Sequence, residues 1–273
     1  MRLLNPDSFP LSLYHKSKSL LWDPAAIDLA VDRADWARLA DPERDILLRL
    51  SRMFLGGEQA VAQDLAPLLI ALRRSGDFME EEMFVTAQLF EEAKHVEWFD
   101  RWMREIAPEA IAAPMDLGPS YAALFDEALP AALDRLLVDA SPRAQVEALV
   151  TYHMIVEGVL AETGYRGYMQ TLKANGLLPG TVRAVELVQR DEARHIAFGL
   201  HALSRLLQAD PSLWAAAEAR LSDLLTLSLD IIGGTFAPYG EAIPFGIDPT
   251  DFVTYAADQF SRRMEVLERA KRV

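Results

Sequence analysis

Apolar residues recur every three or four positions along most of the chain, which is the period of an amphipathic helix. No segment alternates apolar and polar residues over a run rich in β-branched side chains, so no strand is predicted. Proline, glycine and asparagine separate the periodic segments. The pattern predicts helices over residues 23–39, 41–74, 78–106, 120–138, 141–174, 179–208, 211–236 and 248–271.

Local signals set several of these boundaries. Residues 1–22 contain Pro6 and Pro10 and show little periodicity, so we expect an irregular arm packed on the body of the protein. Pro67 lies inside the second predicted helix and should kink it, because proline lacks a backbone donor. Asn175-Gly176 is a typical helix end. No linker rich in Gly, Ser or Pro divides the chain, so residues 1–273 are expected to form a single all-α domain.

Composition narrows the class of protein. Hydrophobic residues make up 51% of the chain and charged residues 25%, as in globular proteins. The net charge of −14 disfavours nucleic acid as a partner. The apolar runs are too short to span a bilayer, and no secretory signal opens the chain. The absence of cysteine excludes disulfides and thiolate chemistry and suits a cytoplasmic protein.

Two similar motifs carry the candidate chemistry. The segment 91–95 reads Glu-Glu-Ala-Lys-His and the segment 191–195 reads Asp-Glu-Ala-Arg-His. In each motif a glutamate and a histidine lie three residues apart, on one face of a helix. Carboxylate and imidazole together suit iron, manganese or zinc.

Single glutamates extend this pattern to a set of six residues. Glu58 precedes Glu92 by 34 residues, and Glu157 precedes Glu192 by 35. Helices of this length run about 45 Å, and an antiparallel return places such residues opposite one another. A glutamate from two helices and Glu-x-x-His from two others form a dinuclear carboxylate site in a four-helix bundle. The predicted metal ligands are Glu58, Glu92, His95, Glu157, Glu192 and His195.

Charge agrees with this prediction. Four carboxylates balance two divalent ions, and oxidation to two trivalent ions leaves room for a bridging hydroxide or water and one anionic ligand. Burying four carboxylates without metal would be very unfavourable. The alternative is that the motifs are surface Glu–His pairs. Asp191 could accept a hydrogen bond from a ligating histidine or be a surface acid. His153 fits a supporting or core role better than ligation.

The motif contexts resemble a known family. They are Gly57 to Val61, Phe90 to His95, Val150 to Tyr152, Val156 to Gly158, Thr163 to Tyr165 and Asp191 to His195. With the six predicted ligands, they resemble the ribonucleotide reductase small-subunit superfamily on a ferritin-like bundle, and most closely its ligand-binding oxidases. The resemblance spans residues 23–260.

The resemblance implies a manganese/iron cofactor that reacts with dioxygen in a two-electron oxidation. It places manganese with Glu58, Glu92 and His95, and iron with the other three ligands. It also implies a tyrosine–valine ether cross-link, here between Tyr152 and Val61. Val61 lies one turn after Glu58. Tyr152 lies five residues before Glu157, so helical periodicity alone would assign it to core packing.

The family also binds a long-chain fatty acid whose carboxylate bridges the metals. Gly158, Ala161 and Gly164 could open a channel for it, and Tyr165 could line that channel. Contact between helices is the alternative role for the small residues. A homodimer is expected from the resemblance only.

Two other functions compete with the oxidase. A radical-storing reductase subunit usually has a tyrosine four residues after the first histidine, where this chain has Phe99, but some such subunits use phenylalanine there with manganese/iron, so this position alone does not decide. Such subunits also need a relay tyrosine near the C-terminus, and this chain has no tyrosine after Tyr255. A ferritin-like metal-storage protein would share the ligands, but without counterparts of Val61 and Tyr152.

Overall fold

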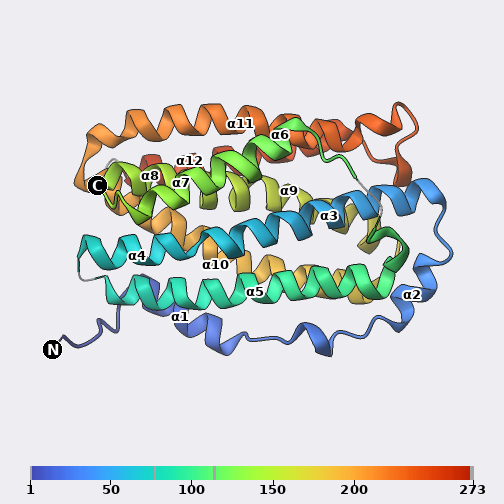
Figure 1. The fold of residues 1–273 in the computed structure, drawn as a ribbon, viewed down its shortest axis with the longest axis horizontal. Helices are drawn as coiled ribbons and strands as arrows, with labels where there is room; N and C mark the ends of the chain where they lie inside the picture. Colours follow the sequence, from blue (N-terminus) through green and yellow to red (C-terminus); the bar gives the residue numbers. More distant parts are fainter. Residues whose placement is uncertain (1, 77, 113–114, 271–273) are drawn as a thin grey trace.

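The structure is a computed structural model that describes residues 2–76, 78–112 and 115–270. Every regular element in these ranges is helical and none is a strand, which confirms the all-α prediction (Figure 1). The α-helices are α1 (Phe9–Ser19), α2 (Ala30–Trp36), α3 (Asp41–Asp64), α4 (Ala66–Ser75), α5 (Met79–Ile106), α6 (Pro119–Ala122), α7 (Leu129–Asp134), α8 (Pro142–Leu149), α9 (Glu162–Tyr168), α10 (Pro179–Ala209), α11 (Trp214–Phe236) and α12 (Pro249–Ala270). Asp77 in the predicted turn and Lys271 at the predicted end of the last helix lie outside the described residues.

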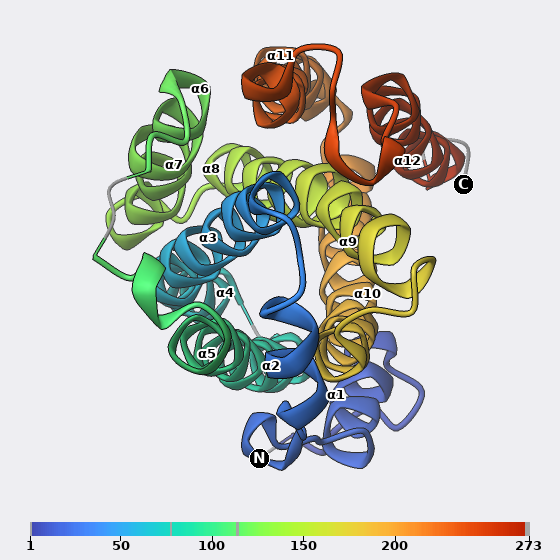
Figure 2. The same cartoon turned by 90° about the vertical axis from the view of Figure 1, so that its right-hand side faces the viewer.

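Four helical rods surround the core of the bundle. They are α3, α5, α10 and the continuous rod that runs from α8 to α9 (Figure 2). Within this ring α3 packs along α5, and α10 packs along the middle of the α8–α9 rod. Large side chains such as Trp98, Trp102 and Phe198 are fully buried between the rods. The result is a ferritin-like four-helix bundle, as predicted.

The remaining helices cover the outside of this ring. Helices α11 and α12 lie against the α8–α9 rod, and α6 and α7 lie beside α3 and α11 (Figure 2). Helix α1 crosses the opposite side, on α5 and α10 (Figure 1).

The N-terminal arm is more ordered than the sequence indicated. Residues 9–19 form α1, whereas the prediction was an irregular arm over residues 1–22. The buried positions Pro10, Leu13 and Ser17 recur at helical spacing, but one is a proline and one a serine, so the apolar pattern of the sequence does not reveal this helix, which packs on α5. The helix predicted over 23–39 is shorter: a 3₁₀ turn (Pro24–Ala26) precedes α2.

Two predicted long helices are interrupted. The helix over 41–74 divides at Leu65 into α3 and α4, because Pro67 in the first turn of α4 cannot donate a backbone hydrogen bond. The helix over 120–138 divides into α6, the π-helical turn Ala123–Ala128, α7 and the 3₁₀ turn Arg135–Leu137. The first break confirms the effect expected of Pro67.

The helix predicted over 141–174 forms one continuous rod, but α-helical and π-helical stretches alternate along it. Between α8 and α9 it is π-helical over Val150–Ala161 (segment η5), and a second π-helical stretch, Met169–Lys173, follows α9. Backbone hydrogen bonds in a π-helix join residues five apart, so such residues share a face that an α-helix would not give them. π-helical turns are often found at functional sites.

Helix α10 is anchored at its start by α2. The carboxylate of Asp32, which is fully buried, accepts hydrogen bonds from the backbone N–H of Gly180 (2.8 Å) and Thr181 (2.6 Å). A negative charge at a helix N-terminus is stabilising because the N–H groups there have no intrahelical partners. A Cβ atom at Gly180 would lie 2.3 Å from the carbonyl oxygen of Asp28, so only glycine fits this approach.

Candidate metal centre

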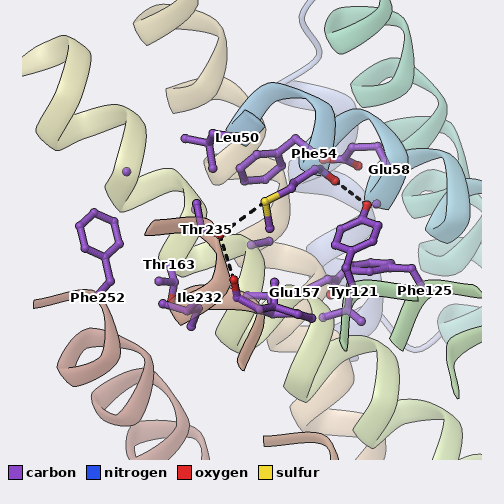
Figure 3. Close-up of a pocket in the computed structure, with 18 of the residues that line it drawn as sticks. Leu50, Phe54, Glu58, Tyr121, Phe125, Glu157, Thr163, Ile232, Thr235 and Phe252 are labelled. Carbon is purple, nitrogen blue, oxygen red and sulfur yellow. Dashed lines mark hydrogen bonds between the residues drawn. The ribbon is translucent and has the colours of Figure 1, made fainter. Parts of the chain in front are cut away.

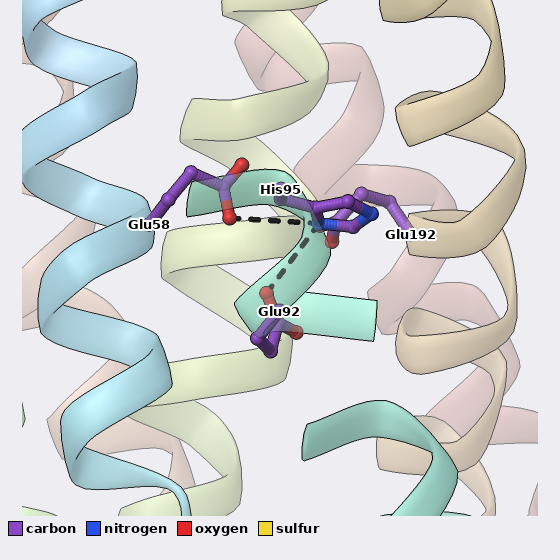
Figure 4. A group of neighbouring side chains, drawn as sticks. All are labelled: Glu58, Glu92, His95 and Glu192. Atoms are coloured by element: carbon purple, nitrogen blue, oxygen red, sulfur yellow. Dashed lines mark ion pairs between the residues drawn. The ribbon is translucent and has the colours of Figure 1, made fainter. Parts of the chain in front are cut away.

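The six predicted ligands converge inside the bundle. Helix α3 contributes Glu58, α5 contributes Glu92 and His95, and α10 contributes Glu192 and His195, while Glu157 comes from η5; all six are buried. They form two overlapping groups, each with ligand atoms within 4.8 Å of one another. One group contains Glu58, Glu92, His95 and Glu192 (Figure 4). The other contains Glu92, Glu157, Glu192 and His195.

Two of the carboxylates reach both histidines. Glu92 places Oε2 3.6 Å from Nδ1 of His95 and Oε1 3.0 Å from Nδ1 of His195. Glu192 does the same, at 3.2 Å and 3.5 Å. Glu58 approaches only His95 (3.5 Å), and Glu157 approaches only His195 (3.3 Å). The arrangement therefore has two bridging carboxylates and one terminal carboxylate on each side.

The atoms that face the centre lack donors. No hydrogen bond within the described residues satisfies Nδ1 of either histidine or Oε2 of Glu92, Glu157 and Glu192, although all are buried. Unsatisfied buried acceptors are strongly unfavourable. Four carboxylates and two neutral imidazoles are the donor set that iron or manganese takes in helical bundles. The residues present fit a pair of such metals.

Without metal, protons compensate for the carboxylate charge. Burial raises the pKa of Glu58 to about 8 and also raises the pKa of Glu157. Burial opposes protonation of His95 and His195, but the surrounding carboxylates outweigh it and raise both pKa values. Burial also acts to raise the pKa of Glu92, yet the two histidines hold it well below its usual range. The cluster thus has a strong tendency to take up positive charge.

Each histidine is supported by an acid from the opposite motif. Nε2 of His195 lies 2.9 Å from Oε2 of Glu91, and Nε2 of His95 lies 3.4 Å from Oδ2 of Asp191. Hydrogen bonds of this kind orient a ligating imidazole and leave its other nitrogen free for a metal. Asp191 is fully buried, so it is not a surface acid. Glu91 was not among the predicted site residues, although it precedes Glu92 as Asp191 precedes Glu192.

Cations from the same motifs neutralise these two acids. One guanidinium nitrogen of Arg194 contacts Oε1 of Glu91 (2.5 Å) and Oδ1 of Asp191 (2.7 Å). Lys94 contacts Oδ2 of Asp191 (2.7 Å), and the indole N–H of Trp22 donates to the same atom (2.7 Å). Two cations therefore balance the two outer acids, and the charge of the four inner glutamates is left for metal ions.

The predicted cross-link residues both lie at the centre. The hydroxyl of Tyr152 donates to Oε1 of Glu92 at 2.9 Å, and Val61 lines a cavity next to Glu58. Because η5 is π-helical, Tyr152 comes round toward the face of Glu157, five residues later. This explains why α-helical periodicity did not select Tyr152.

An apolar cavity of about 110 Å³ opens beside the carboxylates. Its walls come from α3, α6 with the π-helical turn after it, η5, α9, α11 and α12, and Figure 3 shows Glu58 and Glu157 among the lining residues. Glu92 and Glu192 line it too. Ala161 and Gly164 line it as expected. Tyr165 does not, because it stacks behind Phe54 with ring centroids 5.0 Å apart. Gly158 does not line it either, since it faces Arg263 of α12.

Phe99 and His153 are both buried beside the centre. Phe99 is buried and stacks on Phe54, with centroids 5.1 Å apart and planes 9° apart. His153 is fully buried, with Nε2 3.4 Å from the amide group of Gln88.

Within the described residues, no helix combines the length and apolarity needed to cross a bilayer.

Comparison with known proteins agrees with this geometry. The family model of the ribonucleotide reductase small chain matches residues 7–266. An R2-like ligand-binding oxidase with an aerobically reconstituted Mn/Fe cofactor superposes with a TM-score of 0.91 at 32% identity, covering 96% of this chain and 94% of that one. A single-residue variant with an anaerobically reconstituted Mn/Fe cofactor gives a TM-score of 0.92 at 31% identity, covering 96% and 95%.

These matches extend over almost the whole chain and include every element that carries a predicted ligand. The chain belongs to the ribonucleotide reductase small-chain family and groups with its R2-like ligand-binding oxidases.

Proposed function

We propose that the protein is a dioxygen-activating oxidase with a manganese/iron centre held by Glu58, Glu92, His95, Glu157, Glu192 and His195. The observation that carries the proposal is the set of buried acceptors that lack donors and face an apolar cavity. Manganese belongs on the Glu58 and His95 side and iron on the Glu157 and His195 side, by similarity to the family. The neighbouring oxidases carry an Mn/Fe cofactor.

The oxidation includes formation of an ether bond between Tyr152 and Val61. The step removes the phenolic hydrogen and a hydrogen from Cβ of Val61 and forms one C–O bond, so two protons and two electrons are released. Dioxygen accepts these electrons and two more, which the metals supply when bound, and with four protons it leaves as two water molecules.

The surroundings of Tyr152 suit this step. Burial and the nearby glutamates raise the pKa of Tyr152 well above its usual range, so the phenol keeps its proton until it is oxidised. The hydrogen bond to Glu92 Oε1 (2.9 Å) supplies an acceptor for that proton. The apolar walls of the cavity exclude bulk water from the reacting atoms.

The cavity is proposed to hold a long-chain fatty acid. Most of the lining side chains are apolar, and the charged ones are the four glutamates, where the carboxylate head would meet the metals. After oxidation, two trivalent ions exceed the four glutamates by two positive charges. A bridging hydroxide and the fatty-acid carboxylate would cancel that excess.

Intact mass tests the proposal. After aerobic loading with manganese and iron, the protein is expected to be lighter by two hydrogens. Tyr152→Phe and Val61→Ala should abolish the mass loss, and the control Tyr168→Phe should retain it, because the hydroxyl of Tyr168 bonds Ser51 instead (2.8 Å). Organic extraction of the same sample should release the fatty acid. An unmodified mass in the loaded parent protein would contradict the cross-linking oxidase.

That contrary outcome would favour one of the two rival functions, radical storage or metal storage. The buried stack of Phe99 on Phe54 places an aromatic ring without a hydroxyl where a radical-storing subunit usually has tyrosine. A homodimer, a single domain over residues 1–273 and a cytoplasmic location stay predictions that accompany the proposal.

A further inference from the structure

The two sides of the centre differ in the residues behind the terminal glutamates. Phe54 and His153 each lie four residues before a terminal glutamate, Glu58 or Glu157. Gln88 lies four residues before the bridging Glu92, and Val188 lies four residues before the bridging Glu192. Phe99 lies four residues after His95, and Gly199 lies four residues after His195. The equivalent positions therefore carry Phe54, Val188 and Phe99 on one side and His153, Gln88 and Gly199 on the other.

On the His195 side these positions form a polar chain. The amide nitrogen of Gln88 donates to Oε1 of Glu157 at 3.1 Å. Nε2 of His153 lies 3.4 Å from both the oxygen and the nitrogen of the Gln88 amide. Because the amide nitrogen donates to Glu157, the amide oxygen is left to accept, and a proton on Nε2 of His153 completes the chain. All three side chains are buried, so no water competes for the amide.

Gly199 makes room for His153. A Cβ atom at position 199 would lie 2.2 Å from Cβ of His153 and 2.4 Å from its Cγ. On its other sides the imidazole contacts the rings of Tyr152 (centroids 4.6 Å apart) and Phe198 (5.9 Å). His153 is thus fixed in position, and through Gln88 it fixes one oxygen of Glu157.

The His95 side has no comparable support. Val188 offers no hydrogen-bond donor, and Phe54 stacks on Phe99. Among the described residues, the contact of Glu58 with a potential donor is the one to Nδ1 of His95 (3.5 Å), an atom that faces the centre. Glu58 therefore has more freedom to reorient than Glu157.

We propose that Gln88 and His153 are positioning residues that hold Glu157 ready for metal, and that they make the His195 side the tighter of the two positions for a divalent ion. This inference rests on the proposed metal centre. Gln88 holds Oε1 of Glu157, the oxygen that also lies 3.3 Å from Nδ1 of His195, so it fixes the carboxylate against the metal position, and Oε2 is left without a partner. A ligand that is ordered before binding loses less conformational freedom on binding. Both supports are uncharged groups, so they orient Glu157 without changing the charge of the centre.

Site-resolved metal binding tests this proposal. The protein is equilibrated anaerobically with Mn²⁺ alone against a competing chelator, and crystals of the same samples give the occupancy of each position from anomalous diffraction at the manganese edge. Gln88→Met and His153→Phe remove the donors with little change in volume. Loss of such supporting hydrogen bonds typically lowers metal affinity about 10- to 100-fold.

We expect this loss on the His195 side, with a change below about threefold on the His95 side. His153→Gln keeps an N–H donor and should restore most of the affinity. Val188→Ala, at the position equivalent to Gln88, is the control for disturbed packing and should not weaken the His195 side selectively.

Equal losses at both positions, or no loss at either, would overturn the positioning role while leaving the metal centre intact. If either substitution prevents folding, the other still decides the question. A parent protein that binds no metal would overturn the proposed function, and this inference with it.

Discussion

The His95 and His195 sides of the centre have the same inner ligands but different surroundings. Asp191, behind His95, also contacts Trp22, Lys94 and Arg194. Trp22 and Lys94 also line a surface cavity, so on this side the residues that contact Asp191 lie next to the surface of the bundle. Behind His195, Glu91 contacts only Arg194 besides the imidazole within the described residues.

This difference indicates that the two proposed metal positions acquire distinct properties from the residues that surround their ligands. The repeated motifs make the inner ligands nearly symmetric. The residues one layer further out are not repeated, and they determine the polarity, the rigidity and the access to solvent of each side. Differences in metal affinity or reactivity between the two positions should therefore follow substitutions in the outer layer.

Removal of individual glutamates should have the largest effect and separate the two sides. Glu58→Ala is expected to lose about one metal ion per chain from the His95 side, and Glu157→Ala about one from the His195 side. Glu92→Ala should lose both, because its two oxygens face both histidines. Metal content after reconstitution and desalting measures this. Loss of both ions from Glu58→Ala would show that the two positions do not fill independently.

Arg194 should contribute more to stability than Lys94, because it contacts the acids of both sides. Removing one partner of a buried ion pair costs about 3–5 kcal/mol. We expect Arg194→Gln to lower the free energy of unfolding by that amount, and Lys94→Met, which affects Asp191 alone, to lower it less. Denaturant titration of the metal-free proteins measures both changes.

Trp22→Phe serves as the control for this comparison. It removes one of several hydrogen bonds to Asp191 and should reduce stability by about 1 kcal/mol. Equal effects of Arg194→Gln and Lys94→Met would mean that Arg194 does not link the two sides.

Acidity should have a smaller effect, and only on the metal-free protein. Burial raises the pKa of Glu58 from 4.5 to about 8, so the folded state binds a proton that the unfolded state releases. Stability from this group is complete below the unfolded pKa and is lost as the pH rises through the folded value. The expected loss is about 2 kcal/mol between about pH 5.5 and 7.5.

Thermal unfolding of the metal-free protein across this pH range measures the loss. Glu58→Gln should flatten the pH dependence, and so should Glu157→Gln, since burial raises that pKa too. An unchanged slope in Glu58→Gln would assign the dependence to the other groups with raised pKa values, Glu157 and the two histidines.

The sequence could predict that the six proposed ligands converge, because their arrangement follows from helical spacing. Glu92 and His95 share a face at three residues, and Glu58 lies one helix length away. The predicted fold class is confirmed for the same reason. Beyond the antiparallel return of each helix, neither inference required knowledge of how the helices pack.

The outer layer could not be predicted in this way. Trp22 reaches Asp191 across 169 residues of sequence, and Arg194 reaches Glu91 across 103. Such contacts depend on how α5, α10 and the N-terminal segment pack. Tyr165 was misplaced for a similar reason, because its ring packs behind Phe54 instead of facing the cavity.

The π-helical segment η5 makes the number of residues in this rod important, as well as their identity. Its hydrogen-bonding period brings Tyr152 and Glu157 toward one face of the rod. Glu162 continues that face, because the three residues are five apart in the sequence. Deleting one residue within 150–161 would rotate everything before the deletion relative to everything after it. Substitutions there change one side chain at a time, whereas a single insertion or deletion would separate the tyrosine from the glutamate. Sequence length in η5 should therefore vary far less during evolution than its composition.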